Sequence, residues 1–151
     1  MSIRAAQSTD LSAILQLQYE AYQSEAELYQ DYSIQPLTQT IEELELEFAA
    51  GVFLKAELNG RIVGSVRGRI QDGVLSIGKL IVAQSRQNQG IGTKLMQAIE
   101  RWDANIHRCE LFTGHKSLKN LALYERLGYI KLKEIPINEN LTLVYLAKSK
   151  A

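Results

Sequence analysis

Three strand-like runs follow one another between residues 52 and 82, and they constrain the fold more than any other feature of the sequence. Asn59-Gly60 separates the first two runs, Val52–Leu58 and Arg61–Ile70, and Asp72-Gly73 separates the second run from Val74–Val82. Asparagine-glycine and aspartate-glycine pairs accept the positive φ angles that tight hairpin turns require. The sequence therefore predicts three consecutive antiparallel strands.

Further segments with helical or strand-like periodicity surround these three strands. They are a strand at Ile3–Ala5, helices after Ser8–Asp10 and from Thr40 to Gly51, a helix from Ile91 that carries Trp102 and Ile106, a strand at Cys109–Phe112, a helix at Ser117–Leu127, and strands at Tyr129–Lys133 and Thr142–Ala147. A group of strands followed by a strand–helix–strand unit is typical of a mixed sheet with helices on its faces. We therefore expect an α/β fold, a three-layer α/β/α arrangement with a mixed, mostly antiparallel central sheet. Trp102 is expected in its core, and Ser117 as a helix N-cap.

Length and composition limit the function classes. The 151 residues predict one domain over 1–151, and 46% hydrophobic residues suffice for a core. Seventeen basic residues balance 17 acidic ones, which disfavours nucleic-acid partners. The single Cys109 excludes a disulfide framework and a cysteine-rich zinc site, and its expected role is structural. Without an apolar leader or a membrane-length apolar run, we expect a cytoplasmic protein with no membrane partner.

A glycine-bearing loop, Gln87–Thr93, lies between the third strand of this group and the helix that follows it. The free N–H groups and the positive dipole end of a helix N-terminus favour anions, and Gly90 and Gly92 let the backbone approach a pyrophosphate closely. On local sequence alone, a tight turn that holds nothing is the alternative. The loop matches neither the dinucleotide motif nor the Walker motif, because Leu95 replaces the third glycine and Thr93-Lys94 reverses the lysine–threonine order.

Two motifs together resemble one known family. Leu80-Ile81-Val82 is followed by Gln87-Asn88-Gln89-Gly90-Ile91-Gly92, which reads as Arg or Gln, two variable residues, Gly, one residue, then Gly or Ala. The second motif is Asn120–Tyr129, with Asn120 and Tyr124 one helical turn apart. Both are similar to motifs of the GCN5-related N-acetyltransferases, the GNAT superfamily, and the order of elements over the whole chain agrees with that family's fold.

The resemblance implies a function and a set of site residues. It implies an acetyl-CoA-dependent N-acetyltransferase, in which a primary amine attacks the thioester directly within a ternary complex and no metal takes part. The implied acetyl-CoA contacts are Leu80, Ile81, Val82, Gln87, Asn88, Gln89, Gly90, Ile91, Gly92, Thr93 and Asn120. Asn120 would contact the pantetheine side, and Tyr124 would protonate the departing CoA thiolate.

One position departs from the family pattern. Ser76 stands where many relatives carry a glutamate that relays the amine proton to water. The resemblance therefore leaves the proton acceptor open between ordered water, His115, and a carboxylate such as Glu20 or Glu25. An amine that arrives already neutral needs no strong base.

The acceptor side is predicted from residues outside the motifs. Arg67 and Arg69 lie in the second strand of the group, and a charged residue in a central strand needs a partner, either a structural carboxylate or a substrate anion. We expect Arg67 to bind an anionic group on a small amine, under a flap formed by residues 25–32 that includes Glu25 and Tyr29. His115 is a further candidate contact, because strand-end loops often line sites in α/β folds.

Several alternatives stay open at this point. A lysine side chain or the N-terminus of a protein is a second class of acceptor. Association of two copies of the chain into a homodimer is also an open alternative. A different class of function is a catalytically weak or inactive acyl-CoA-binding regulatory module, which the serine at position 76 favours. A scaffold protein without CoA would leave the paired motifs unexplained.

Overall fold

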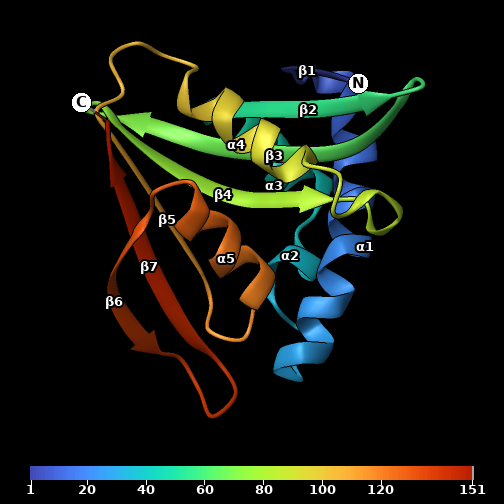
Figure 1. Ribbon diagram of the computed structural model, residues 1–151. Helices are drawn as coiled ribbons and strands as arrows, with labels where there is room; N and C mark the ends of the chain where they lie inside the picture. The colour runs from blue at the N-terminus through green and yellow to red at the C-terminus, as the bar shows by residue number, and fades with distance from the viewer. Residues whose placement is uncertain (151) are drawn as a thin grey trace.

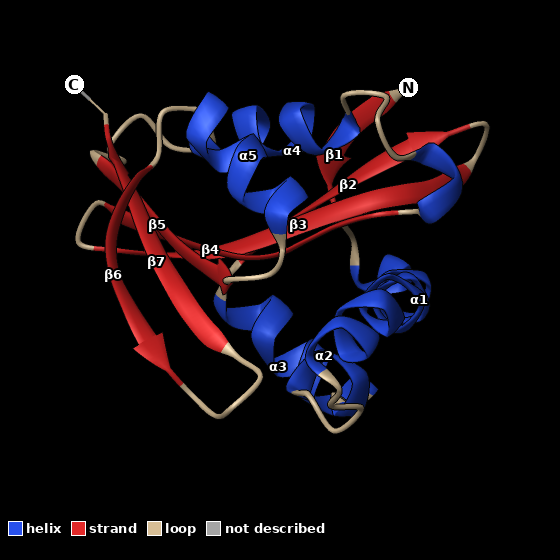
Figure 2. Ribbon diagram, turned by 60° about the horizontal axis from the view of Figure 1, so that its bottom comes forward, coloured by secondary structure: helices blue, strands red, loops and turns tan. Residues whose placement is uncertain are grey.

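The computed structural model describes residues 1–150, which form a seven-stranded sheet with helices on both faces (Figures 1 and 2). The strand order is β1-β2-β3-β4-β5-β7-β6, and the only parallel pair within these residues is β4 with β5. Figure 2 shows α4 and α5 on one face of the sheet and α1, α2 and α3 on the other. The predicted three-layer arrangement with a mixed, mostly antiparallel sheet is confirmed.

The elements follow the predicted order with three additions, the short helix α2 and two 3-10 turns. Their bounds are β1 Ser2–Ala5, η1 Ser8–Asp10, α1 Leu11–Tyr29, α2 Gln35–Thr38, α3 Ile41–Ala50, β2 Val52–Leu58, β3 Arg61–Gln71, β4 Val74–Val82, η2 Gln84–Arg86, α4 Ile91–Glu100, β5 Arg108–Gly114, α5 Leu118–Arg126, β6 Ile130–Pro136 and β7 Thr142–Ser149. Both hairpin turns have the predicted positive φ angles, +53° at Asn59 and +75° at Gly60, then +52° at Asp72 and +77° at Gly73.

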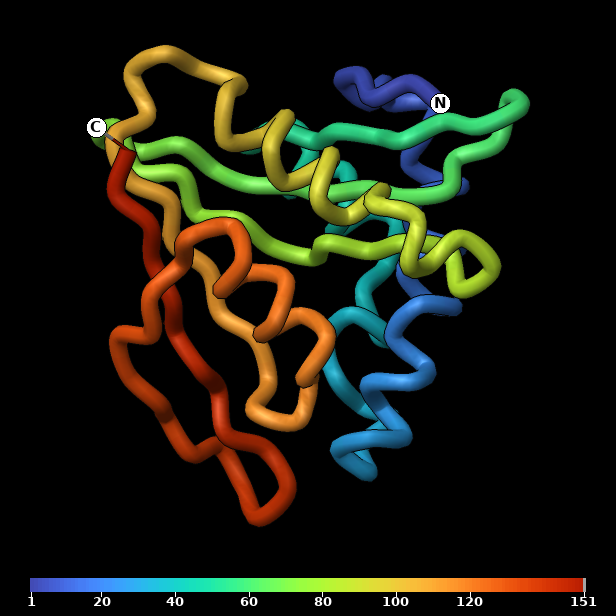
Figure 3. The backbone as a smooth tube through the Cα atoms, in the orientation of Figure 1, coloured from blue at the N-terminus to red at the C-terminus, as the bar shows by residue number. Residues whose placement is uncertain are grey.

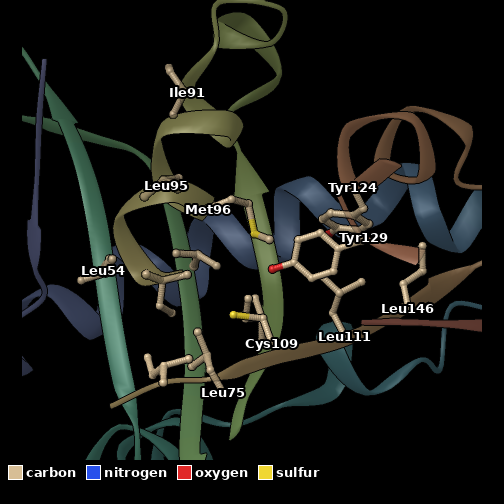
Figure 4. Close-up of a cluster of buried hydrophobic side chains, with 14 of the residues drawn as sticks. Leu54, Leu75, Ile91, Leu95, Met96, Cys109, Leu111, Tyr124, Tyr129 and Leu146 are labelled. Atoms are coloured by element: carbon tan, nitrogen blue, oxygen red, sulfur yellow. The ribbon is translucent and has the colours of Figure 1, made fainter. Parts of the chain in front are cut away.

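The larger core lies between the sheet and the pair α4 and α5. Leu95 and Met96 of α4 pack there with strand residues such as Leu75 and Leu111 (Figure 4). Cys109 is fully buried in this core, as its structural role requires. A smaller cluster holds α1 and α3 against β2, so each helical layer has its own apolar contact with the sheet.

Two predicted boundaries were wrong. Helix α4 ends at Glu100, and Arg101 already leaves the helical conformation, so Trp102 lies beyond the helix and is 48% exposed instead of buried in the core. The predicted flap over residues 25–32 is also incorrect in its first half, because α1 stays helical to Tyr29 and ends at Gln30 with φ +54°. Leu17 and Ala26 are buried along this helix, and their burial stabilises the extension.

The end of α1 is fixed to the loop between β5 and α5. The Lys116 backbone N–H donates to the Tyr29 hydroxyl oxygen at 2.9 Å, and the Tyr29 and Ser117 hydroxyls lie 2.8 Å apart. The Ser117 hydroxyl donates to Glu25 at 2.9 Å, so Tyr29 is the donor to Ser117. A Cβ atom added at Gly114 would lie 2.0 Å from the Tyr29 hydroxyl oxygen, so this contact requires a glycine at position 114.

Strand β4 carries an irregularity halfway along its length. Ser65 pairs with Ile81 and Arg67 with Gly78, so two β4 residues, Lys79 and Leu80, lie opposite one β3 residue. Lys79 has φ +46°, an uncommon conformation for a residue with a side chain. This is a β-bulge, and such bulges bend a strand and increase its twist.

Strands β4 and β5 separate just before the bulge. They pair only from Val74–Ser76 to Arg108–Glu110, and Figures 1 and 3 show them diverging from there, with α5 following the end of β5. The divergence exposes the edges of both strands in the middle of the sheet. Backbone groups that would be paired in a continuous sheet are therefore available to a ligand.

We expect Gly114→Ala to lower the free energy of unfolding by about 1–3 kcal/mol, because the added methyl group overlaps the Tyr29 ring. The measurement is urea denaturation in a double-mutant cycle. In a Tyr29→Ala background the same change should cost less than about 0.5 kcal/mol, since the overlap is gone. An equal cost in both backgrounds would contradict this account of the contact.

Candidate functional site

A cleft of about 1230 Å³ opens where β4 and β5 part. Its walls are the C-terminal half of α1, the end of β4, the loop that leads into α4, and α5 with the residues that precede it. Of the predicted acetyl-CoA contacts, those that line this cleft are Leu80, Ile81, Val82, Gln87, Asn88, Gly90, Ile91, Gly92, Thr93 and Asn120. Gln89 is exposed and does not line it.

The loop before α4 presents free donors to this cleft. Asn88 and Gly90 both have positive φ, +64° and +81°, which turns the chain sharply into the helix. Among residues 1–150, the backbone N–H groups of residues 88–93 find no acceptor, and the first helical bond runs from Lys94 to Gly90. An added Cβ at Gly90 would meet nothing within 4 Å. The loop is therefore a cradle of unsatisfied amides at a positive dipole end, which suits a phosphate group.

Asn120 and Tyr124 lie on α5, and they differ in exposure. Asn120 lines the cleft. Tyr124 does not line it and is only 6% exposed, with its ring centroid 6.0 Å from that of Tyr129 (Figure 4). Burial raises the pKa of the Tyr124 hydroxyl, and the nearby Tyr22 and Glu25 raise it further. The hydroxyl is therefore protonated throughout the neutral pH range.

One residue that the sequence analysis missed, Tyr22, and one that it named, Glu25, lie on the α1 wall. Tyr22 lines the cleft, and burial followed by the charge of Glu25 raises the pKa of its hydroxyl. Only its position on the apolar face of α1 signalled it, and that position is typical of a core residue. Glu25 also lines the cleft, and burial raises the pKa of its carboxyl although the Ser117 hydroxyl bond lowers it.

His115 and Tyr29, two of the predicted substrate-side residues, form hydrogen bonds that connect parts of the protein to one another. The Thr142 backbone N–H donates to Nδ1 of His115 at 2.9 Å, which joins the β5–α5 loop to the start of β7. Tyr29 makes the bonds to Lys116 and Ser117 described above. Neither side chain lines the cleft. Ser117 precedes α5 as predicted, but its hydroxyl bonds Glu25 and makes no cap bond.

Arg67 lines a second hollow, described below, but its guanidinium is bonded within the protein, so the structure does not support the predicted anion-binding role. Its side chain is 2% exposed, and its guanidinium donates to Glu47 at 2.6 and 3.1 Å, to Gln18 at 2.9 Å and to Gln39 at 2.9 Å. Its carbon Cζ lies 5.1 Å from the centre of the Phe53 ring. Burial alone would raise the pKa of the Glu47 carboxyl, but the charge of Arg67 and the bond from Gln39 lower it. The partner of this arginine is a structural carboxylate.

A second hollow, of about 460 Å³, adjoins the stretch of β4 that precedes the bulge. Its lining includes Ser76–Gly78 of β4, Glu110–Phe112 of β5, Tyr145 of β7 and Leu132 of β6, together with Glu47 of α3. Lys79 stands between the β4 residues of the two hollows. Burial and the charge of Arg67 lower the pKa of the Lys79 amine to about 8.

Two classes of site are not found in residues 1–150. No group of three or more histidine, cysteine, aspartate or glutamate side chains there is arranged to hold a metal ion. None of the helices in that range combines the length and apolar character needed to cross a membrane.

Comparison with known proteins agrees with this geometry. The model of the Acetyltransferase (GNAT) family matches residues 11–129. An uncharacterized N-acetyltransferase of Methanocaldococcus jannaschii is 28% identical over 139 residues, which cover 90% of this chain and 82% of that protein.

Solved structures share the fold over nearly the whole chain. The ribosomal-protein-S18-alanine N-acetyltransferase of Escherichia coli superposes with a TM-score of 0.80 at 15% identity, covering 99% of this chain and 94% of that one. The yncA protein of Salmonella typhimurium, solved with acetyl-CoA, superposes with a TM-score of 0.78 at 19% identity, covering 100% of this chain and 94% of that one. At these identities the likeness concerns the fold.

We expect Arg67→Gln to lower the free energy of unfolding by about 3–5 kcal/mol, because Glu47 loses the partner of a largely buried ion pair. Arg69→Gln is the matched control. Arg69 is exposed on the same strand, so its replacement should change stability by less than about 0.5 kcal/mol. Chemical denaturation of both variants is the measurement, and equal stability of the two would contradict the structural role of Arg67.

Proposed function

The chain belongs to the GNAT family of acetyltransferases, and from this premise we propose that it transfers the acetyl group of acetyl-CoA to a primary amine by direct attack in a ternary complex. The observation that carries this proposal is the row of unsatisfied backbone N–H groups at residues 88–93, at the mouth of the larger cleft. These donors suit the pyrophosphate of acetyl-CoA. Membership of an acetyltransferase family indicates that the acetyl group is the part of acetyl-CoA that is transferred.

The rest of the cleft fits the remainder of acetyl-CoA. The end of β4, Leu80–Val82, lies beside the gap between the strands, where its backbone can pair with an extended amide-bearing chain such as pantetheine. Asn120 adds a side-chain amide on the opposite wall. The pyrophosphate and pantetheine contacts would then follow one line from the start of α4 toward the gap between β4 and β5.

The transfer forms one bond, breaks one bond and moves three protons. The amine nitrogen attacks the thioester carbon, the C–N bond forms, and the C–S bond breaks. The departing thiolate takes the proton of the Tyr124 hydroxyl, the amine gives up a proton to water, and a proton from water then restores the Tyr124 hydroxyl. Glu20 and Glu25 both line the cleft, which supports a carboxylate beside that water, whereas His115 is engaged with Thr142. Holding both reactants in one orientation supplies much of the rate.

We propose a small molecule as the acceptor. The second hollow, which adjoins β4 just before the bulge, has a volume of about 460 Å³, a size suited to a small ligand. The Escherichia coli neighbour is by its name an enzyme that acts on a ribosomal protein. A peptide N-terminus is therefore the competing acceptor class.

An acyl-CoA-binding regulatory module is the second candidate function, because Ser76 provides no carboxylate on β4. Release of free thiol from acetyl-CoA in the presence of a panel of amines distinguishes the two candidates. Sustained release that depends on the amine supports the enzyme. Binding of acetyl-CoA without any release supports the regulatory module.

Replacement of Gly92 tests the cofactor cradle. Gly92→Val should raise the KM for acetyl-CoA at least about 10-fold, because the added side chain projects toward Leu80 and Leu123 on the cleft wall. Gln97→Val on the exposed face of α4 is the control and should leave this KM unchanged. The measurement is steady-state kinetics with varied acetyl-CoA. A folded Gly92→Val enzyme with normal acetyl-CoA affinity would rule out the cradle.

Replacement of Tyr124 tests the general acid. Tyr124→Phe should lower kcat by about 10²–10⁴-fold with little change in acetyl-CoA affinity, because only the proton donor is removed. Tyr129→Phe is the matched control. The Tyr129 hydroxyl donates to Glu100 at 2.6 Å within the core, so its loss should reduce stability and spare kcat. If Tyr124→Phe keeps the normal kcat, water or the substrate protonates the thiolate.

A further inference from the structure

We propose that the second hollow binds the body of the acceptor and selects a primary amine that carries an aromatic-sized apolar group. This inference rests on the proposed acetyl transfer and adds the substrate class to it. It replaces the anionic amine predicted from Arg67, since that arginine is occupied within the protein.

The position of the hollow suits an acceptor. The cleft proposed for acetyl-CoA takes Leu80–Val82 from β4, and the hollow takes Ser76–Gly78 from the same strand. Only Lys79 separates the two stretches, at the bulge. A ligand in the hollow therefore lies one residue of β4 away from the end of the acetyl-CoA cleft, at the point where β4 and β5 have parted.

The hollow is lined by aromatic and apolar side chains together with five charged residues, which are Glu47, Arg67, Arg69, Glu110 and Lys133. Phe112 pairs with Tyr145 across β5 and β7, and their ring centroids lie 5.4 Å apart. Phe112 is 56% exposed and Leu132 is 51% exposed, although both contribute to the lining. Exposed aromatic and aliphatic side chains gathered around one hollow are typical of a site that buries an apolar ligand.

The floor of the hollow is a glycine that the protein itself does not require. Gly78 lies opposite Arg67 in the β3 register, in ordinary extended backbone without a positive φ. A Cβ added at Gly78 would meet no atom within 4 Å. Neither backbone conformation nor packing explains the missing side chain. An occupant of the hollow explains it, because a side chain at this position would project into the space that the occupant fills.

The charges around the hollow do not favour one sign. Arg67 forms an ion pair with Glu47. The Lys133 amine nitrogen lies 5.0 Å from the centre of the Tyr145 ring. Arg69 and Glu110 pair with Ser76 from either side, so they bring opposite charges to the same level of the sheet. Selection by the apolar walls is therefore stronger than selection by net charge.

The test compares 2-phenylethylamine with ethylamine, which is the same amine without the ring. We expect kcat/KM to be roughly 10-fold to 100-fold higher for 2-phenylethylamine, because only this amine buries an apolar group in the hollow. Glycine, which carries a carboxylate beside its amine, and spermidine, which is a polycation, should also be poor acceptors. A short peptide with a free N-terminus tests the competing protein acceptor.

Two variants connect this preference to the hollow. Gly78→Val fills the floor and Phe112→Ala removes one wall, and each should bring the ratio of the two kcat/KM values close to one while the KM for acetyl-CoA stays normal. Trp102→Ala is the matched control, since Trp102 is also a partly exposed aromatic residue and does not line the hollow. It should leave the ratio unchanged.

The outcomes separate this inference from the proposed function. Calorimetry with acetyl-CoA alone tests the cofactor cleft, and failure to bind contradicts the proposed function. Chemical shifts of the Gly78 and Phe112 amides on titration with 2-phenylethylamine test the hollow independently of turnover. The inference is overturned if those shifts do not move, if ethylamine or the peptide is acetylated as well as 2-phenylethylamine, or if both variants keep the preference.

Discussion

The β-bulge at Lys79 and Leu80 is the constraint on which the rest of the site depends. It places two residues of β4 opposite Val66, and only Ile77 and Gly78 separate it from Ser76, the last residue of β4 that pairs with β5. Both hollows adjoin the strand stretch that this irregularity creates, one on each side of Lys79. Both proposed ligand sites therefore lie beside this local change in backbone register.

The strained strand is supported by a polar cluster on the α3 side. Arg67 pairs with Gly78 in the register, directly before the bulge. Its guanidinium donates hydrogen bonds to Gln18 of α1, to Gln39 between α2 and α3, and to Glu47 of α3. A buried ion pair seldom adds much net stability, but its geometry allows few alternative arrangements. This cluster therefore fixes α1 and α3 relative to β3. Burial is the main cause of the lowered pKa of the Lys79 amine, and the positive charge of Arg67 lowers it further.

Local signals predicted most of the fold and the cofactor loop. The Asn59-Gly60 turn, the helix that begins after Thr40 and the turn at Gly90 each depend on a few neighbouring residues, and each forms as predicted. The errors arose where a distant contact decides the outcome. Trp102 fits the helical period, yet α4 ends before it, and the acidic stretch beyond Tyr22 continues as helix because Leu17 and Ala26 are buried against other elements.

The two hollows differ in the same respect, and this explains why only one of them could be predicted. The proposed acetyl-CoA cleft depends on backbone amides within one loop, so a short motif describes it. The second hollow needs Gly78, Phe112, Tyr145 and Leu132 from four strands, brought together by the register shifts in β4 and β6. Because no spacing along the chain encodes that juxtaposition, members of one fold family can keep the loop and exchange these side chains independently. Specificity for the acceptor can then change without loss of acetyl-CoA binding.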